Sequence, residues 1–327
     1  MACSYDFVER LPKELSIKIF MSSKYDSSNP AEFCVVSKLW RRFVIENGLC
    51  KKFCLNLCPE ASKIIDVAEV LDKPERVCRI DALKIDEVLE RNHRVFSVLG
   101  NYLDTYRLGG QIEERICASS YGRVPDEPYS SEDDYDYSSI DDENPTYWSS
   151  TGTRDPNIPE TVVYKTICNL CIIQEIHVLP FEGNYESDFP IYSAKAVRFS
   201  FGCRSPFKKE NTFRSQYYED DMFIWMYTSP EFSMAQELAI QVFHLPRPIF
   251  CIGGIIKMEL LGRAQKNSYD GLYYVSVDGV EAIGQYVPRM FDVEVVDETG
   301  NCILKCNWEH HYSTNEIAEE EFCQCSP

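Results

Sequence analysis

Apolar residues recur with a helical period at the start of the chain. Leu11, Leu15 and Ile19 are four residues apart, and Phe20 widens the same stripe. This spacing is typical of the apolar face of an α-helix. Pro12 suits the first turn of that helix, where its missing N–H costs no hydrogen bond. We therefore predict a short amphipathic helix that begins near Pro12.

A turn cluster, Ser27-Ser28-Asn29-Pro30, ends this helix and precedes a second one. The second helix is predicted to start near Ala31, with its apolar positions at Phe33, Val36, Leu39, Trp40 and Phe43. Two helices of this length bury little surface by themselves, so an apolar face would remain for a partner to cover. The alternative is that both are ordinary core helices of a larger helical domain.

The order of residue pairs in this segment resembles an F-box, the helical module that binds a Skp-type adaptor of cullin-based ubiquitin ligases. The pairs are Leu11-Pro12, Ile19-Phe20, Val36-Ser37 and Trp40-Arg41, and the resemblance covers residues 7 to 55, so that we assign 1–55 to this module. Between the helices the chain has Asn29-Pro30-Ala31 where the family usually has a leucine. The resemblance implies an adaptor contact made by Leu11, Pro12, Leu15, Ile19, Phe20, Val36, Trp40 and Phe43.

Helical spacing continues beyond the F-box-like segment and predicts a helical extension over residues 56–118. Its apolar positions are Ile64, Ile65, Ala68 and Leu71, then after Pro74 Val77, Ile80, Leu83, Val88 and Leu89, and finally Val95, Phe96, Leu99 and Leu103. We expect these helices to pack onto the N-terminal module.

An acidic segment follows. Between Arg123 and Arg154 the chain has no Lys or Arg, while Asp and Glu accumulate. Such a composition buries too little apolar surface to order itself, so residues 119–145 are predicted to be a disordered linker. A second hypothesis is a phosphorylatable tether, since Ser130 and Ser131 precede acidic residues. Residues 313–327 are interpreted as an acidic C-terminal tail.

From Tyr147 the apolar period changes from helical to two. Val197, Phe199 and Phe201 alternate with polar or small residues and fall on one face of a strand. Further strands are predicted at 172–178, 222–227, 238–243, 255–261, 273–277 and 291–296, with a hairpin turn at 297–301. The fold class is therefore α+β multidomain: an N-terminal all-α F-box with extra helices, and a C-terminal all-β antiparallel sandwich over 146–312.

The second half also carries a resemblance. Tyr147-Trp148-Ser149-Ser150, residues 159–164, Ile176-His177-Val178 and residues 255–262 are similar to a galactose-binding, discoidin-like jelly roll. An F-box followed by such a domain resembles a small plant F-box family. The resemblance names no substrate.

Charge and cysteine content restrict the function classes. A formal net charge of −19 disfavours binding to nucleic-acid phosphates. No apolar run approaches the roughly 18–20 residues that span a bilayer, and the first residues lack a signal-peptide layout. The 15 cysteines, without a secretion signal, are interpreted as reduced thiols. We expect a cytoplasmic or nuclear protein, or both, with no membrane or nucleic-acid partner.

Cysteines and histidines give little support to an enzyme. Cys168 and Cys171 form a C-x-x-C, but no second ligand pair at zinc-site spacing accompanies them. His93, His177 and His244 occur in no recognisable catalytic motif, and His93 and His244 have no evident carboxylate partner. We expect no catalytic residue, metal or cofactor.

Two loops of the predicted sandwich are candidates for target binding. One carries Arg204, Lys208, Lys209 and Arg214, and the other carries Arg263, Lys266 and Tyr269. Basic and aromatic residues bind acidic peptides or sugars by ion pairing and ring stacking. The alternative is that both are merely solvated hairpin loops.

These patterns favour a non-catalytic interaction protein, the substrate-recognition subunit of an SCF-type (Skp–cullin–F-box) ubiquitin ligase. The F-box would bind a Skp-family adaptor, and through it cullin, while the sandwich binds a target of unassigned identity, acidic or glycosylated. Transfer would then depend on proximity alone. The alternative is a glycan- or small-ligand-binding module with a secondary or degenerate F-box.

Overall fold

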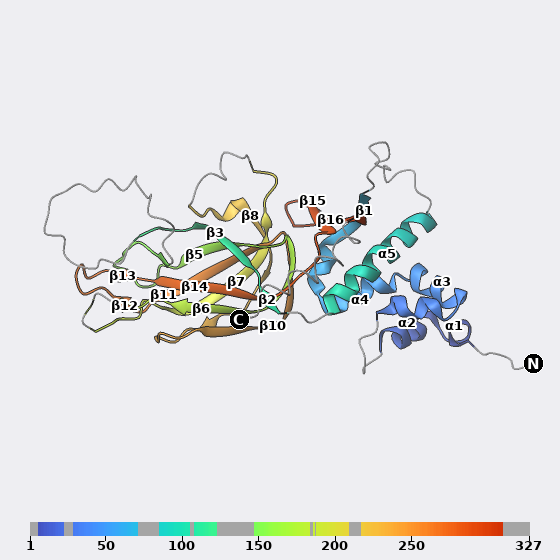
Figure 1. Ribbon diagram of the computed structural model, residues 1–327, viewed down its shortest axis with the longest axis horizontal. Coiled ribbons are helices and arrows are strands. Elements are labelled where there is room, and N and C mark those ends of the chain that lie inside the picture. The colour runs from blue at the N-terminus through green and yellow to red at the C-terminus, as the bar shows by residue number, and fades with distance from the viewer. Residues whose placement is uncertain are drawn as a thin grey trace, which may run out of the picture. The chain divides into compact units, whose positions relative to one another are not determined.

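The computed structural model describes residues 6–22, 29–70, 85–104, 108–122, 147–183, 186, 188–208 and 217–309. The chain forms two compact units (Figure 1). The first unit consists of Met1–Arg107, Val287–Asp297 and Asn301–Pro327, and the second of Leu108–Tyr286 and Glu298–Gly300. The second unit is thus inserted into the sequence of the first.

Several short helices and one long helix, α5, make up the N-terminal part of the first unit. They are α1 (Phe7–Arg10), α2 (Lys13–Met21), η1 (Pro30–Val35), α3 (Lys38–Glu46), α4 (Leu49–Leu57), η2 (Pro59–Lys63) and α5 (Ile85–Asp104). The first predicted helix is confirmed as α2. The second divides into the 3-10 helix η1 and the α-helix α3, because the Ser37 side chain caps α3 by accepting from the Trp40 N–H at 3.1 Å.

Aromatic rings form the centre of this helical part. Phe20 is 3% exposed, and its ring centroid lies 5.2 Å from those of Phe33 and Trp40 and 5.5 Å from that of Phe43. Phe7 contacts the same cluster, 5.1 Å from the Trp40 ring. Contacts at these separations stabilise small cores beyond their buried area.

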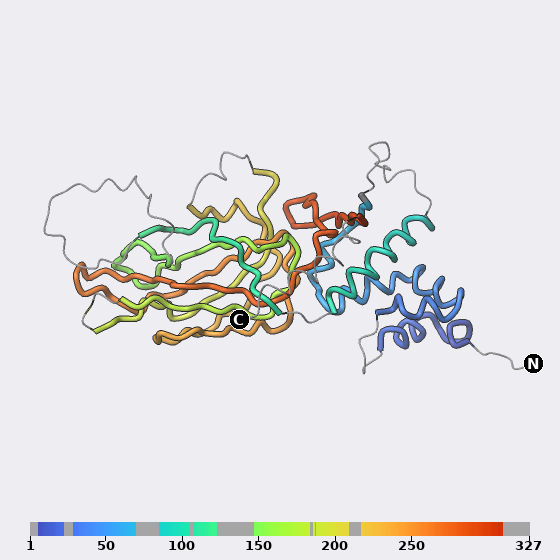
Figure 2. Tube along the Cα trace, viewed as in Figure 1, coloured from blue at the N-terminus to red at the C-terminus, as the bar shows by residue number. Residues whose placement is uncertain are grey.

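A three-stranded sheet completes the first unit, in the order β1-β16-β15. Its strands are β1 (Ile64–Val70), β15 (Phe291–Val295) and β16 (Cys302–Asn307). Strand β1 pairs with β16 in parallel, and β15 pairs with β16 antiparallel. Figure 2 shows the red C-terminal hairpin beside the blue trace of β1.

The predicted helix at residues 64–71 is wrong, because 64–70 form the strand β1. Four of its seven residues are the β-branched Ile64, Ile65, Val67 and Val70, which favour a strand. The helix predicted over residues 88–103 is confirmed as α5, with Val95, Phe96 and Leu99 buried. The predicted helix over 74–84 lies outside the described residues.

The predicted hairpin at 297–301 is confirmed. The Val296 N–H donates to the Asn301 carbonyl at 2.8 Å, and Gly300 adopts a φ of 83° that favours glycine. The hairpin was expected to end the sandwich at residue 312. Instead, its second strand, β16, pairs with β1, and Leu304 and Cys306 of β16 are fully buried.

Two antiparallel sheets form the second unit. The first contains β3 (Ile112–Ala118), β5 (Glu160–Thr166), β11 (Ile255–Arg263), β7 (Ala194–Arg204) and β8 (Phe223–Thr228) in that order, with β9 (Phe232–Ser233) on β7. The second contains β10 (Gln241–Ile252), β6 (Leu170–Pro180), β14 (Ser276–Tyr286) and β2 (Gly109–Gly110), with β4 (Trp148–Ser149) on β14. A two-stranded ribbon joins β12 (Gln265–Lys266) and β13 (Tyr273–Tyr274).

The side chains between these sheets come from alternate positions on their strands. Val197, Phe199 and Phe201 on β7 are at most 1% exposed, as their alternation predicted. They share one core cluster with Ile173 and Ile176 of β6. The prediction of N-terminal helices followed by an antiparallel β-sandwich is confirmed.

The acidic segment does not separate the helices from the sandwich. Strands β2 and β3 precede it and pair with β14 and β5, so the segment interrupts the second unit. Residues 119–122 of the predicted linker belong to this unit: the Ser119 N–H donates to Thr161 O at 2.8 Å, and the Gly122 N–H donates to Ser149 O at 3.0 Å. Residues 123–146 and the predicted tail, 313–327, lie outside the described residues.

Candidate functional site

Five large apolar side chains among the described residues between 11 and 36 are exposed to solvent. We call them the exposed apolar set: Leu11 (37% exposed), Leu15 (46%), Ile19 (45%), Val35 (89%) and Val36 (58%). Leu15 and Ile19 lie on α2, whereas Val35 ends η1 and Val36 follows it. Aliphatic side chains that stay exposed in a small helical module are candidates for contact with a protein partner.

The structure divides the predicted adaptor-contact residues into two groups. Leu11, Pro12, Leu15, Ile19 and Val36 are exposed, as a partner contact requires. Phe20 is buried at the centre of the aromatic cluster, so its prediction as a contact residue is wrong. Trp40 and Phe43 are half-buried against Phe20, and Trp40 Nε1 donates to Asp6 Oδ2 at 2.8 Å.

Sequence reasoning missed the most exposed member, Val35. The Val35-Val36 pair was the available signal. Neighbouring residues on a helix point in different directions, so two adjacent valines cannot both face the protein core. Its position at the end of η1 depends on Ser37, which stops that helix and starts α3.

A histidine lies between two thiols behind η1. His93 Nε2 is 3.7 Å from Cys34 Sγ, and His93 Nδ1 is 3.4 Å from Cys50 Sγ. Burial raises the pKa of Cys34, and burial together with Cys34 raises the pKa of Cys50 to about 12. Burial and the nearby Arg41 charge lower the pKa of His93. Neutral thiols beside a neutral imidazole are poor nucleophiles, so the cluster is suited to packing.

The cysteines of the sandwich have a similar environment. Cys171 is fully buried and faces Cys251 across the β6–β10 pair. Its hydrogen bond with Cys251 and its burial raise the pKa of Cys171. Within the ranges that the structure describes, no group of three or more His, Cys, Asp or Glu side chains is placed to hold a metal ion.

Arg263 was predicted to bind a target, and this prediction is wrong. The residue is 2% exposed and forms an ion pair with Glu160. Its Nη1 donates to Thr151 O at 2.6 Å, to Ser150 Oγ at 2.9 Å and to Tyr273 O at 3.1 Å. A buried, fully bonded guanidinium fastens strands together and is not available to a ligand.

The first predicted recognition loop is described only at its start. Arg204 is exposed at the end of β7, and Lys208 forms an ion pair with Asp221, which raises the pKa of Lys208. Lys209 and Arg214 lie outside the described residues.

The second predicted loop does present its residues to solvent. Tyr269 is 41% exposed, and Lys266 is exposed with Nζ 5.9 Å from the centroid of the Tyr273 ring. Glu186, which is 6% exposed, contacts the buried side of the loop. Its carboxylate accepts from the Ser268 N–H at 3.0 Å and from Asn267 Nδ2 at 3.2 Å. These hydrogen bonds tie the loop to the buried Glu186 carboxylate.

Phe189 belongs to the same end of the sandwich and was missed by sequence reasoning. Its N–H donates to Glu186 O at 3.1 Å, its ring is 56% exposed, and its φ is 46°. A positive φ is strained for a non-glycine residue and is often kept for function. No local sequence signal marks this conformation. We call the segments that carry Phe189 and Tyr269 the candidate recognition loops, and Phe189, Lys266 and Tyr269 are their exposed residues.

Two histidines of the sandwich share one carboxylate. Glu175 Oε1 lies 2.9 Å from His177 Nε2, and Glu175 Oε2 lies 2.8 Å from His244 Nδ1. The prediction that His244 lacks a carboxylate partner is therefore wrong. The residues lie on adjacent strands, with His244 opposite Glu175 in the register.

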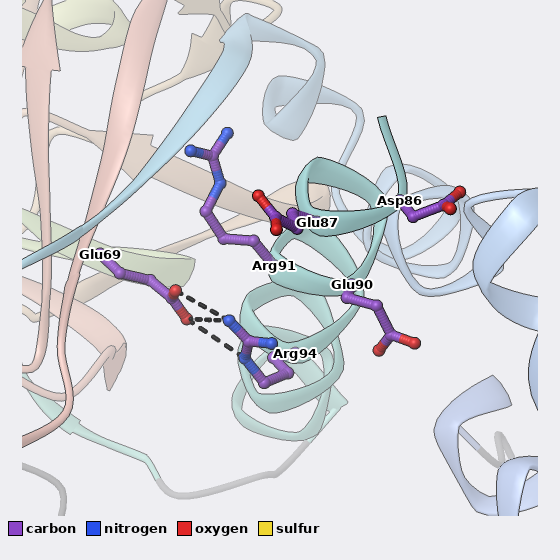
Figure 3. A pocket seen from close by; sticks show the side chains of 6 residues that line it. All are labelled: Glu69, Asp86, Glu87, Glu90, Arg91 and Arg94. Carbon is purple, nitrogen blue, oxygen red and sulfur yellow. Dashed lines mark hydrogen bonds and ion pairs between the residues drawn. The ribbon is translucent and has the colours of Figure 1, made fainter. Parts of the chain in front are cut away.

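A shallow cavity of about 350 Å³ lies beside α5 and β1 (Figure 3). Its lining is charged and consists of Glu69, Asp86, Glu87, Glu90, Arg91 and Arg94. Arg94 Nη2 donates to Glu69 Oε2 at 2.8 Å, and Arg91 Nη2 donates to Asp66 Oδ1 at 3.0 Å. Ligand pockets are mostly apolar, whereas these ion pairs fasten α5 to β1.

None of the helices in the described ranges is long and apolar enough to cross a membrane. That finding concerns only the part of the chain with a described structure.

Comparison with solved structures gives carbohydrate-binding modules with low scores. A family 32 module of NanJ from Clostridium perfringens, in complex with galactose, aligns with a TM-score of 0.30 at 10% identity, over 54% of this chain and 93% of that chain. A further module, CBM32-3 from a family 31 glycoside hydrolase of Clostridium perfringens, aligns with a TM-score of 0.31 at 13% identity, over 53% of this chain and 90% of that chain. Scores this low support no conclusion about a ligand.

Comparison with curated sequences is decisive for the family. No family model matches this chain. A protein of Arabidopsis thaliana that is named an F-box protein is 35% identical over 312 residues, which are 92% of this chain and 81% of the relative. The similarity therefore includes both the helical part and the sandwich, and this chain belongs to the F-box proteins.

Proposed function

We propose that this F-box protein is the substrate-recognition subunit of an SCF-type ubiquitin ligase. Its F-box segment binds a Skp-family adaptor, and through it cullin, and its sandwich binds the protein to be ubiquitinated. The observation that carries the proposal is the exposed apolar set, which lies in the segment that resembles an F-box. Covering a half-exposed Leu or Val contributes about 1 kcal/mol each, so five such side chains support a stable complex.

The proposed mechanism needs no reactive group on this chain. The adaptor fixes the receptor on the ligase, and the bound target gains a high effective concentration near the ubiquitin-conjugating enzyme. The raised pKa values of Cys34 and Cys50 agree with a non-catalytic role, because their thiols stay protonated. All described cysteines are free thiols, which agrees with a cytoplasmic or nuclear location.

Target binding is assigned to the recognition loops. Phe189 and Tyr269 present aromatic rings, and Lys266 adds a positive charge at the same end of the sandwich. The buried Glu186 bonds to both loops, to Ser268 through its carboxylate and to Phe189 through its backbone carbonyl. Loops that are ordered before a target binds lose less conformational entropy on binding. An acidic protein segment with an apolar side chain fits these groups.

Exposed aromatic rings also favour a second candidate, a module that binds a glycan or another small ligand. Rings such as Phe189 and Tyr269 stack on the apolar face of a sugar as readily as on a peptide. In that case the F-box would be secondary or degenerate.

Adaptor binding separates the two candidates. The purified full chain is mixed with a purified Skp-family adaptor and analysed by size-exclusion chromatography. Co-elution supports the receptor. A folded chain that elutes alone, yet gains thermal stability from a sugar, supports the second candidate and contradicts the first.

A further inference from the structure

Asn29 connects the exposed apolar set to the rest of the first unit. It precedes η1, the 3-10 helix that ends at Val35, and it is only 4% exposed. Its side-chain Oδ1 accepts from the Ala31 N–H at 3.1 Å and so caps this helix. This bond involves only the oxygen of the side-chain amide, so the Nδ2 group can donate elsewhere.

The other half of the amide bonds to α5. Asn29 Nδ2 donates to the Ser97 carbonyl at 2.5 Å and to Asn101 Oδ1 at 2.9 Å. A single buried side chain thus joins the start of η1 to two successive turns of α5. Asn29 itself is buried, Ser97 is half-buried and Asn101 is exposed, so the bonds form at the edge of the core.

A glycine on α5 makes room for this contact. A Cβ added at Gly100 would lie 3.0 Å from Asn29 Nδ2 and 3.0 Å from Phe53 Cδ1. Glycine is a poor helix former, so its position within the 20-residue α5 needs a reason beyond helix formation. The close approach of both Asn29 and the Phe53 ring supplies that reason.

The far end of η1 also contacts α5. Cys34, next to Val35, lies 3.7 Å from His93 Nε2. Helix α5 is fastened in turn to β1 by the Arg91–Asp66 and Arg94–Glu69 ion pairs. The position of Val35 and Val36 is therefore determined from α5, through Asn29 at one end of η1 and Cys34 at the other.

We propose that Asn29 is a positioning residue for adaptor binding. It orients η1 so that Val35 and Val36 face the same partner as α2. This role accounts for the sequence Asn29-Pro30-Ala31 at the place where a leucine is usual in the family. The inference rests on the proposed function, because it concerns the affinity of the same surface.

Two variants test the positioning role in the full-length chain. Asn29→Ser keeps a capping oxygen, but its side chain is too short to reach α5. Gly100→Ala favours the helix while it pushes Asn29 away. Ser97→Ala is the matched control, because it removes a hydroxyl bonded to Arg94 O and keeps the carbonyl that Asn29 uses.

Adaptor affinity is measured by biolayer interferometry well below the unfolding temperature of each variant. We expect Asn29→Ser and Gly100→Ala to weaken the Kd about threefold to tenfold through a faster dissociation rate, as loss of one or two hydrogen bonds predicts. Ser97→Ala should stay within about twofold of the original chain. A merely structural role would lower the unfolding temperature and leave the Kd of the folded protein unchanged.

The outcomes separate this inference from the proposed function. If the original chain binds the adaptor and Asn29→Ser and Gly100→Ala bind it equally well, the positioning role is overturned and the receptor function stands. If the folded original chain does not bind the adaptor, both fail together.

Discussion

Alanine substitution of Leu15 and Val35 tests the adaptor surface most directly. The two side chains come from different elements, α2 and η1, and are 46% and 89% exposed. Because they bury little surface within the chain, the double variant should lose less than about 1 kcal/mol of unfolding free energy. Thermal unfolding followed by circular dichroism measures this loss.

The expected effect on binding is much larger. Complete burial of a Leu or Val side chain contributes about 1.5–3 kcal/mol. The alanine variant retains the part of this free energy that its methyl group contributes. Only the surface that is exposed in the free chain is left for the partner to bury. The two substitutions should therefore remove about 2–3 kcal/mol of binding free energy. This corresponds to an affinity for a Skp-family adaptor that is about 30-fold to 150-fold weaker, measurable by titration calorimetry.

The sandwich provides a matched control. Leu238 and Val242 are of the same types and are 53% and 44% exposed, but they lie in or beside β10 of the other unit. Their double alanine variant should bind the adaptor like the original chain. Equal affinity of the Leu15/Val35 variant and the original chain, or equal weakening by the control, would refute the assignment of the surface.

Three further predictions concern stability. A chain cut at a protease site engineered between residues 130 and 140 should still elute as one species at about 10 µM, because β3 pairs with β5 and β1 with β16 across the cut; separate fragments without denaturant would contradict these pairings. Glu160→Gln should lower the unfolding free energy by about 3–5 kcal/mol in urea titrations, because it leaves Arg263 buried without its counter-charge; an unchanged midpoint would count against the buried pair. Burial lowers the pKa of His93 in the folded chain, so the contribution of His93 to the unfolding free energy should be full above about pH 6.5 and fall below it. His93→Gln should reduce the slope of unfolding free energy against pH in this range. Equal slopes in both proteins would mean that other groups cause the pH dependence.

Local patterns predicted the elements whose burial is set by near neighbours. Helix α2 and strand β7 have one apolar face each, and a period of four or two identifies such a face without knowledge of the fold. Strand β10 was predicted only at residues 238–243, and the structure extends it past Pro246 and Pro248 to Ile252. The structure accommodates both prolines at a register shift between His244 and Ile249, on the edge of the sheet.

Elements and roles set by distant partners could not be predicted in this way. Strand β1 is a strand because β16 pairs with it from the other end of the chain. The apolar spacing of a short segment fits a helix equally well. Arg263 was interpreted as a loop cation because its partner Glu160 is 103 residues away. The sequence also contains nothing that marks the positive φ of Phe189.

The insertion of the second unit into the first affects how the proposed receptor would work. The chain leaves the first unit after Arg107 and re-enters it at Val287. At least two stretches of backbone therefore join the first unit, which carries the proposed adaptor surface, to the sandwich. Two covalent connections restrict the relative motion of two units more than one linker does. Every arrangement of the units must keep the ends of both connections within reach of each other. Effective concentration falls as the accessible volume grows. A target bound at the recognition loops would therefore explore a smaller volume around the adaptor than it would on a single tether, which favours transfer by proximity without a reactive residue on this chain.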